Sequence, residues 1–333
     1  MSRSTIRVRI EHDDALEFDA DVLVLKHAQQ LHGVDEVVYR ALVAGRRRVQ
    51  LPKIGQHTIV EAPEAFGATQ ILFLGVEPLH NFRYGEIRQF GHQAMVTLRD
   101  EQVPAAHVAL TIHGPGYGLD ETESFSAEVA GILEAISSGD YPDGLELISF
   151  VENNKGRAMR LEAVLEEMIP DGTIARSRGS LVGIDKPARR ALRSAGYESA
   201  SKQRAFVAMP FADSMEDVFH FGIQGAVNAV GMLAERADLA TFTGDVMDWV
   251  RTRIAGADFV IADVTGSNAN VYLEVGYAWA KGVPTILLTK KAKDLKFDVR
   301  GQRCIVYKSI KDLHEKLSRE LGALGAARGD SAA

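Results

Sequence analysis

The sequence predicts an α/β protein with two domains, and three observations lead to this fold class. Short apolar runs rich in Val, Ile and Leu alternate with segments of helical spacing along most of the chain, which is typical of sheets covered by helices. A polar stretch rich in Gly, Ser, Arg and Lys, residues 170–203, interrupts the alternation, which then restarts. The length of 333 residues is enough for two domains of ordinary size.

Residues 1–169 are expected to form the first domain, a three-layer α/β unit with a mostly parallel sheet. The run DVLVL at residues 21–25 is almost continuously apolar, as are strands of a parallel sheet whose two faces are both covered. Strands are expected at residues 6–10, 21–25, 57–62, 71–76, 107–113 and 145–151. Helices are expected at residues 34–43, 84–99, 120–137 and 159–168.

Residues 204–323 are expected to form the second domain. Strands are expected at residues 204–208, 232–237, 259–264, 284–288 and 304–307, with helices at 214–230, 245–255 and 310–321 and a further helix after the turn at residues 265–268. Five strands with helices between them predict a flavodoxin-like, doubly wound parallel sheet. The intervening residues 170–203 are expected to be a linker with one short helix that begins at Pro187. Residues 324–333 are expected to be a disordered tail.

Composition limits the classes of partner. The formal net charge is −7, so no global basic field is present to hold nucleic acid. No apolar run has the length of a signal peptide or of a membrane span. The single cysteine, Cys304, cannot form an internal disulfide, and no Cys/His metal spacing is present. We therefore expect a cytoplasmic protein with no metal, no bound cofactor and no nucleic-acid or membrane partner.

The stretch ADFVIADVTGSNANVYLEVGYAWAKG, residues 257–282, is the strongest functional signal. It predicts a buried strand, a polar turn and a helix, and a helix that begins beside such a turn is a ready site for an anion. The helix carries one carboxylate, Glu274, among apolar neighbours. Ligands of doubly wound sheets bind at the carboxyl ends of strands. We interpret the stretch as an active site; the alternative is that Glu274 is an ordinary solvated residue.

Together with VAMPF at residues 207–211, this stretch resembles the nucleoside 2-deoxyribosyltransferase superfamily. That superfamily includes deoxynucleotide N-glycosidases and is structurally close to the TIR domains that cleave NAD. The resemblance covers about residues 204–321. It implies that Glu274 is the nucleophile at the anomeric carbon, or stabilises the oxocarbenium ion. Chemistry agrees, because cleavage of an N-glycosidic bond builds positive charge on the sugar, which a carboxylate stabilises or traps.

The resemblance also implies a set of substrate contacts. They are Met209, Pro210 and Phe211, which would wall the base and sugar, and Ser267, Asn268 and Asn270, beside the 5′-phosphate. Helix capping alone would also explain Ser267 and Asn268, and an ordinary strand end would explain Met209. True deoxyribosyltransferases typically have an aspartate at the position of Asn268. An amide cannot transfer a proton, so this residue favours hydrolysis over base exchange.

A neutral leaving base needs a general acid. The family places an aspartate on the preceding helix, which Asp245 or Asp248 matches. Asp263, at the end of the predicted strand, could hold a ribose hydroxyl or only bond the backbone of the turn. Nicotinamide leaves from a cationic form and needs no acid, so NAD is a candidate substrate.

The first domain resembles macro domains and the related N-terminal domain of leucine aminopeptidases in residues 18–28, 32–42 and 113–136. Macro domains bind ADP-ribose and its derivatives. The implied ligand loops contain Gly33 and Asp35 on one side, and Gly114, Gly116, Tyr117 and Gly118 on the other. Glycines let backbone N–H groups approach phosphates, and a tyrosine can stack on a ring. Macro domains usually carry an asparagine after the second strand, and this chain has Lys26-His27-Ala28 there. This difference argues against a hydrolase role for the first domain.

These observations give one main hypothesis and two alternatives. The main hypothesis is an N-glycosidase that cleaves NAD or a (deoxy)nucleotide, acts as an antiviral or stress effector, and is activated by an ADP-ribose-like or other nucleotide. We expect such a protein to be a homo-oligomer. The alternatives are a nucleotide-binding signalling module in which Glu274 only fixes a ribose, and an oligomerising scaffold.

Overall fold

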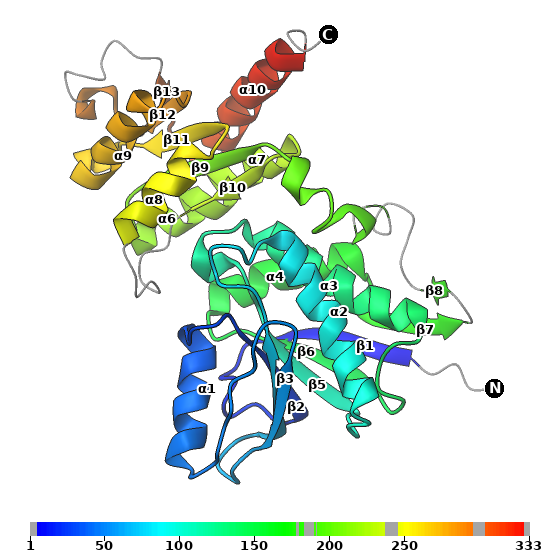
Figure 1. The fold of residues 1–333 in the computed structure, drawn as a ribbon. Coiled ribbons are helices and arrows are strands. Elements are labelled where there is room, and N and C mark those ends of the chain that lie inside the picture. The colour runs from blue at the N-terminus through cyan, green and yellow to red at the C-terminus, as the bar shows by residue number, and fades with distance from the viewer. Residues whose placement is uncertain are drawn as a thin grey trace. The chain divides into compact units, whose positions relative to one another are not determined.

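The fold was analysed in a computed structural model, which describes residues 5–177, 180–182, 190, 192–236, 246–295 and 304–329. Contacts divide the chain into two compact units, both visible in Figure 1. Unit 1 comprises Met1–Gly116 and Glu121–Ala200, and unit 2 comprises Tyr117–Asp120 and Ser201–Ala333. Both units are α/β layers, as the sequence predicts.

Unit 1 is built on an eight-stranded mixed sheet in the order β3-β4-β2-β5-β6-β1-β7-β8. The strands are β1 (Thr5–Glu11), β2 (Ala20–His27), β3 (His57–Glu61), β4 (Ala68–Gly75), β5 (His107–Thr111), β6 (Leu147–Val151), β7 (Thr173–Ser177) and β8 (Ser180–Val182). The run from β4 to β1 is parallel, and β3, β7 and β8 add antiparallel edges. The helices are α1 (Gly33–Ala44), α2 (Tyr84–Asp100), α3 (Glu121–Ser138) and α4 (Lys155–Met168), with short 3-10 turns η1 (Pro115–Tyr117) and η2 (Ser199–Ser201).

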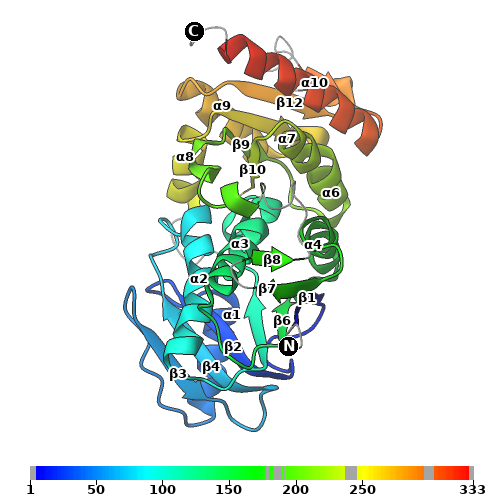
Figure 2. The same cartoon turned by 90° about the vertical axis from the view of Figure 1, so that its right-hand side faces the viewer.

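Helices cover both faces of this sheet. On α1, Val38 and Leu42 lie one turn apart and pack with Leu23 and Leu25 of β2, so α1 covers one face. On the other face, α2 and α3 lie side by side (Figure 2). Phe125 of α3 meets Phe150 of β6 edge to face, with ring centroids 5.0 Å apart. The result is the predicted three-layer arrangement.

Two parts of residues 170–203 differ from the expected linker. β7 pairs antiparallel with β1, and Ile174 lies opposite Ile6, both fully buried. Further on, the guanidinium of Arg88 donates to the carbonyls of Leu192 and Ala195 at 2.7 and 2.6 Å, which fixes this segment on α2. The helix expected to begin at Pro187 lies outside the described residues.

Unit 2 has a parallel five-stranded sheet in the order β10-β9-β11-β12-β13. The strands are β9 (Arg204–Ala208), β10 (Leu233–Glu235), β11 (Phe259–Asp263), β12 (Thr285–Thr289) and β13 (Cys304–Val306). The helices are α6 (Asp213–Asp217), the π-helix η3 (Val218–Gln224), α7 (Gly225–Ala229), α8 (Val246–Ala255), α9 (Ala269–Ala280) and α10 (Ile310–Gly329), with 3-10 turns η5 (Thr265–Ser267) and η6 (Ala292–Asp294). This is the flavodoxin-like strand order.

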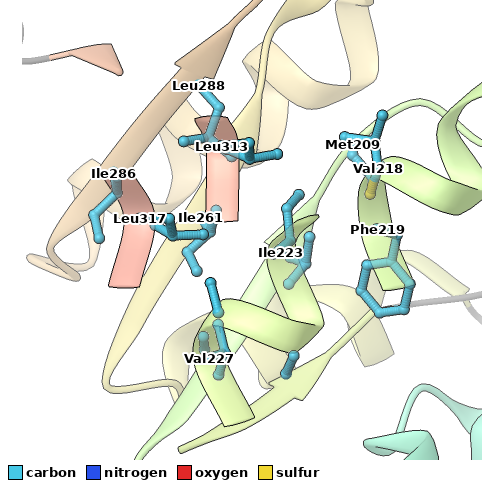
Figure 3. Packing of buried hydrophobic residues seen from close by; sticks show 14 of the residues in the cluster. Met209, Val218, Phe219, Ile223, Val227, Ile261, Ile286, Leu288, Leu313 and Leu317 are labelled. Atoms are coloured by element: carbon cyan, nitrogen blue, oxygen red, sulfur yellow. The ribbon is translucent and has the colours of Figure 1, made fainter. Parts of the chain in front are cut away.

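Two apolar layers hold the sheet of unit 2, one on each face. Figure 3 shows Leu313 and Leu317 of α10 and Ile223 of η3 packed against Ile261 and Ile286 of the sheet. The opposite face packs against α8 and α9 through buried residues of the second cluster: Val250, Ile254, Val260, Ala262, Val271, Val275 and Ala278. Successive strand residues therefore face opposite layers, as expected for a doubly wound sheet.

Two features of unit 2 depart from the expectations. The helix expected at residues 214–230 contains the seven-residue π-helix η3. α10 continues to Gly329, so residues 324–329 are helical and the expected disordered tail is wrong there. Residues 330–333 lie outside the described part of the chain.

The strand order locates a site. From β9 the chain runs to β10 on one side of the sheet and then crosses to β11 on the other. Ligands of such sheets bind where the winding reverses, outside the carboxyl ends of the strands. In unit 2 this is the edge formed by the ends of β9 and β11, where Met209–Phe211 and the turn before α9 begin.

Candidate active site

The turn between β11 and α9 has an unusual backbone. Gly266 and Ser267 both have positive φ angles, 74° and 57°, a conformation that non-glycine residues rarely adopt. The backbone N–H of Ser267 returns to the carbonyl of Val264 at 3.0 Å. Asn268 is the N-cap of α9, and its side chain accepts from the N–H of Asn270 at 2.9 Å. The capping role expected for Asn268 is confirmed, and Asn270 contributes its backbone to that cap.

Asp263 lies beneath this turn and does not face a ligand. Its side chain is fully buried, Oδ1 accepts from the N–H of Thr265 at 2.9 Å, and Oδ2 accepts from the hydroxyl of Tyr307 at 2.6 Å. Both carboxylate oxygens of Asp263 therefore have partners within the protein. Of its two alternatives, the bond to the turn backbone is the one observed.

The same turn is tied to the next strand. The hydroxyl of Thr265 accepts from the N–H of Lys290, which directly follows β12, at 3.0 Å. Asp263, Thr265, Lys290 and Tyr307 therefore join the ends of β11, β12 and β13. Such a support fixes the position at which α9 begins.

Glu274 lies on α9, six residues after the cap. Val271, Val275 and Ala278 turn into the core, and Glu274 shares their side of the helix because it is three residues after Val271 and four before Ala278. α9 contacts β9, β11 and β12. The carboxyl group is thus carried by the helix that follows the turn at the carboxyl end of β11.

The environment of Glu274 is apolar and lacks a counter-charge. Its side chain is half-buried, and no described residue donates a hydrogen bond to it. Burial disfavours the charged carboxylate and raises the pKa of Glu274 to about 7. A carboxyl group of this kind is an uncompensated negative charge when ionised, which suits the stabilisation of a cation.

The loop after β9 divides into a buried and an exposed part. Met209 is buried in the core with Val218 and Phe219 (Figure 3), so its expected place in a substrate wall is wrong and its strand-end role is the one observed. Pro210 is half-buried, and the ring of Phe211 is 48% exposed. Phe211 remains available to a ligand at this edge of the sheet.

Arg236, which follows β10, is a residue that the sequence did not single out. Its guanidinium lies 4.1 Å from the ring centroid of Phe219 and 5.7 Å from that of Phe211. Nη2 pairs with Glu216 of α6 at 2.9 Å. A hydrogen bond from His220 and the charge of Arg236 lower the pKa of Glu216 to about 2. The sequence carried one signal for this group, an arginine within the strand expected at residues 232–237.

The described residues do not place an expected general acid at the site. Asp245 lies outside the described residues. Asp248 is exposed and pairs with Arg251 at 3.1 Å. Asp258 accepts from the backbone N–H of Arg204 at 2.9 Å, at the amino end of the sheet and therefore opposite the site.

Packing within the protein occupies part of the ligand loops expected in unit 1. Gly33 has a φ of 56° at the start of α1, but Asp35 is buried in an ion pair with Lys26 at 2.5 Å. At Gly114, with a φ of 106°, a Cβ would lie 2.4 Å from Ser124 Oγ, so packing requires this glycine. At Gly116 a Cβ would meet no atom within 4 Å.

The other two residues of that loop, Tyr117 and Gly118, belong to unit 2. A Cβ at Gly118 would lie 2.8 Å from both the carbonyl of Arg236 and the ring of Trp249. Packing against the protein therefore requires glycine at position 118. The residues of the predicted phosphate loop are divided between the two units.

Two further observations concern the described part of the chain. Its His, Cys, Asp and Glu residues form no group of three or more that could hold a metal ion. None of its helices combines the length and the apolar composition needed to cross a membrane.

Comparisons with known proteins give structural likeness only. No protein-family model matches this chain, and no curated protein sequence matches it. A CMP N-glycosidase of Clostridium botulinum is similar to 35% of this chain over 99% of its own, with 20% identity and a TM-score of 0.31. The Oceanobacillus iheyensis macrodomain with ADP is similar to 51% of this chain over 100% of its own, with 14% identity and a TM-score of 0.38. Tomato leucine aminopeptidase is similar to 87% of this chain over 83% of its own, with 10% identity and a TM-score of 0.32.

Proposed function

We propose that unit 2 is an N-glycosidase that hydrolyses the bond between base and sugar of a nucleotide, with Glu274 as its catalytic carboxylate. The observation that carries this proposal is the place of Glu274. It is half-buried on α9, the helix that follows the turn at the end of β11, and no described residue neutralises it. NAD, CMP and deoxynucleoside monophosphates are the candidate substrates.

The chemistry follows from the charge that the reaction develops. As the bond between the anomeric carbon and the base nitrogen breaks, its electron pair leaves with the base and the sugar becomes cationic. The ionised Glu274 either stabilises that cation or bonds to the anomeric carbon until water replaces it. Water supplies the new hydroxyl on the sugar and releases one proton. A neutral base takes up a proton as it leaves. Nicotinamide needs no proton, because its own ring is cationic in NAD and becomes neutral when the bond breaks.

Asn268 supports water as the acceptor rather than a second base. Its side-chain oxygen caps α9 by accepting from the N–H of Asn270, and an amide has no proton to exchange at neutral pH. Phe211 is the exposed aromatic surface at this edge on which a base can stack.

The proposal extends to unit 1 as a sensor. In this part of it, an ADP-ribose-like or other nucleotide binds near Gly33 and Gly116 and activates a homo-oligomer as an antiviral or stress effector. Gly33 has a left-handed backbone and Gly116 has open space around it. Titration calorimetry of the full chain with ADP-ribose checks this part. Absence of heat, with unchanged hydrolysis when ADP-ribose is added, would remove the sensor and leave the hydrolase.

The decisive experiment compares full-length wild type and Glu274→Gln. Each is incubated at several protein concentrations with NAD, NADP, CMP and deoxynucleoside monophosphates, and free base is measured by chromatography. Glu315→Gln is the matched control, because Glu315 is an exposed carboxylate of the same unit. We expect base release by wild type and the control and its loss in Glu274→Gln. Equal release by all three would remove Glu274 from the mechanism. Tight binding without release from any substrate would favour the alternative, a nucleotide-binding module.

A further inference from the structure

A group of polar side chains is buried inside unit 1, where β2 and β5 end. We call it the Lys26 cluster. Its members are Lys26, Asp35, Thr111, His113, Ser124 and Glu128, exposed by 2, 2, 5, 2, 0 and 0%. Lys26 lies near the end of β2, Thr111 and His113 lie at and beyond the end of β5, and the others come from the first turns of α1 and α3. So many polar groups in one core require partners.

Hydrogen bonds join members of the cluster in pairs. Lys26 Nζ donates to Asp35 Oδ2 at 2.5 Å. Glu128 Oε2 accepts from the backbone N–H of His113 at 3.3 Å, a long bond. Ser124 and Glu128 are four residues apart and therefore on one side of α3. The charge of Lys26 acts on Asp35, His113 and Glu128 alike.

Several atoms of the cluster have no hydrogen-bond partner within the described protein. They are Asp35 Oδ1, Thr111 Oγ1, His113 Nε2, Ser124 Oγ and Glu128 Oε1. Buried polar atoms are nearly always hydrogen-bonded, to protein or to ordered water. Five such atoms in one buried cluster therefore point to a bound occupant rather than to scattered packing defects.

The charges define what that occupant can be. Lys26 and Asp35 already neutralise each other at 2.5 Å. Burial raises the pKa of Glu128 well above its usual value and lowers the pKa of His113 well below its own, so burial favours the neutral form of both groups. An anion would face the oxygens of Asp35 and Glu128, and a cation would face Lys26. The open atoms include hydroxyls, which donate and accept, and an imidazole nitrogen, which donates or accepts according to its tautomer.

We propose that the Lys26 cluster binds a group of ordered water molecules inside unit 1, which complete the hydrogen bonds of Asp35, Thr111, His113, Ser124 and Glu128. Water is neutral, donates and accepts, and forms about three hydrogen bonds at a buried site. The wall beside it is aromatic: the ring of His113 meets Phe90 edge to face at 4.5 Å and Phe82 at 6.3 Å. This wall confines the water to the polar side of His113.

The stability of unit 1 is expected to fall at both acid and alkaline pH, because Glu128 and His113 are buried in the cluster. Ionisation of Glu128 at alkaline pH, or protonation of His113 at acid pH, adds a charge that no cluster member neutralises. The charged or titratable groups that surround the cluster are Lys26, His27, His32, Asp35 and Glu36. Because the folded state holds the proton of Glu128 more tightly than the unfolded state, this contribution to stability is complete at acid pH and is lost as the pH rises.

Two experiments on the full chain test the proposal. A crystal structure at high resolution is expected to show ordered water within hydrogen-bond distance of Glu128 Oε1, His113 Nε2 and Thr111 Oγ1. A cluster that closes on itself without water, or that holds an ion or an organic ligand, would overturn the proposal.

The second experiment is hydrogen exchange of peptides from β5 and α3 between about pH 6 and pH 9, corrected for the intrinsic pH dependence of exchange. It compares wild type with Glu128→Gln and with Glu162→Gln, an exposed carboxylate on α4. We expect wild type and Glu162→Gln to lose protection together as the pH rises, and Glu128→Gln to lose less. Identical profiles for all three would contradict a contribution of Glu128 ionisation to the stability of the cluster.

Discussion

The hydroxyl of Tyr307 donates to Asp263 Oδ2 at 2.6 Å, and both residues are buried. This contact joins the residue after β13 to the end of β11, beneath the turn that starts α9. Because Asp263 also accepts from the N–H of Thr265 at 2.9 Å, the buried pair sets the turn from which the Glu274 helix projects. Asp263 therefore acts on the candidate site through the backbone and not by touching a substrate.

Tyr307→Phe removes this hydrogen bond and leaves Asp263 Oδ2 buried without its donor. We expect the free energy of unfolding to fall by about 1–3 kcal/mol, the usual cost of leaving a buried acceptor unsatisfied. Urea denaturation of the full chain measures the loss. Tyr277→Phe is the control, because no described residue bonds the hydroxyl of Tyr277. Equal effects of the two variants would contradict the supporting role of the pair.

The pH dependence of base release tests the state of Glu274. If the ionised carboxylate stabilises the cationic sugar, kcat/KM for a substrate that does not itself titrate rises with pH and levels off above the pKa of about 7. Glu274→Gln is expected to lower kcat by about 100-fold or more, since the amide carries no charge. A profile that falls as the pH rises through 7 would assign Glu274 the role of a proton donor instead.

Glu274 also affects stability, with the opposite sign. Its folded pKa of about 7 lies above the usual 4.5, so its contribution is complete at acid pH and is lost as the pH rises through 7. We expect Glu274→Gln to be more stable than wild type at about pH 8, by roughly 1–3 kcal/mol, and similar to it at about pH 4. Thermal unfolding at the two pH values measures this crossover. A variant that is less stable at both would show that the carboxylate is structurally satisfied.

The sequence predicted the strands and helices of both units closely, because their apolar runs and helical spacing are strong local signals. β9 and β11 are almost wholly apolar, β2 has an apolar centre, and each lies where it was expected. The strand order of unit 2 followed from the number and alternation of the elements. β7 was missed because TIARS contains a basic and several small residues, and because its partner is distant in sequence: Ile174 lies opposite Ile6, 168 residues away.

The candidate site was predictable only where the chain carries it locally. Glu274 and the cap at Asn268 lie on one continuous stretch, so helix geometry places them. The partner of Asp263 is 44 residues further on, and the pair of Arg236 with Glu216 is 20 residues apart in sequence. Spacing alone contains no information about such contacts, and so both alternatives for Asp263 stayed open and Arg236 was overlooked.

Arg236 is expected to stabilise the edge of unit 2 at β10. Its side chain is 10% exposed, pairs with Glu216 and lies over the ring of Phe219. Arg236→Met is expected to cost about 1–3 kcal/mol, from the lost cation–π contact and from Glu216 without its cation. Because the depressed pKa of Glu216 contributes stability above its unfolded value and loses it as the pH falls toward 2, the difference between wild type and variant should shrink at acid pH to the cation–π part. Arg319→Met, on the exposed side of α10, is the control for denaturation at both pH values.

The buried ion pair of Lys26 with Asp35 allows a test by single and double substitution. Both side chains are 2 to 3% exposed and 2.5 Å apart. Lys26→Met leaves a buried carboxylate and Asp35→Asn leaves a buried ammonium, so each is expected to cost about 3–5 kcal/mol. The double variant removes both charges and should recover much of that loss, because neither group is then unpaired. The coupling energy from the double-mutant cycle, measured by urea denaturation, should exceed about 1 kcal/mol. Simple addition of the two losses would mean that each residue has other partners that carry its charge.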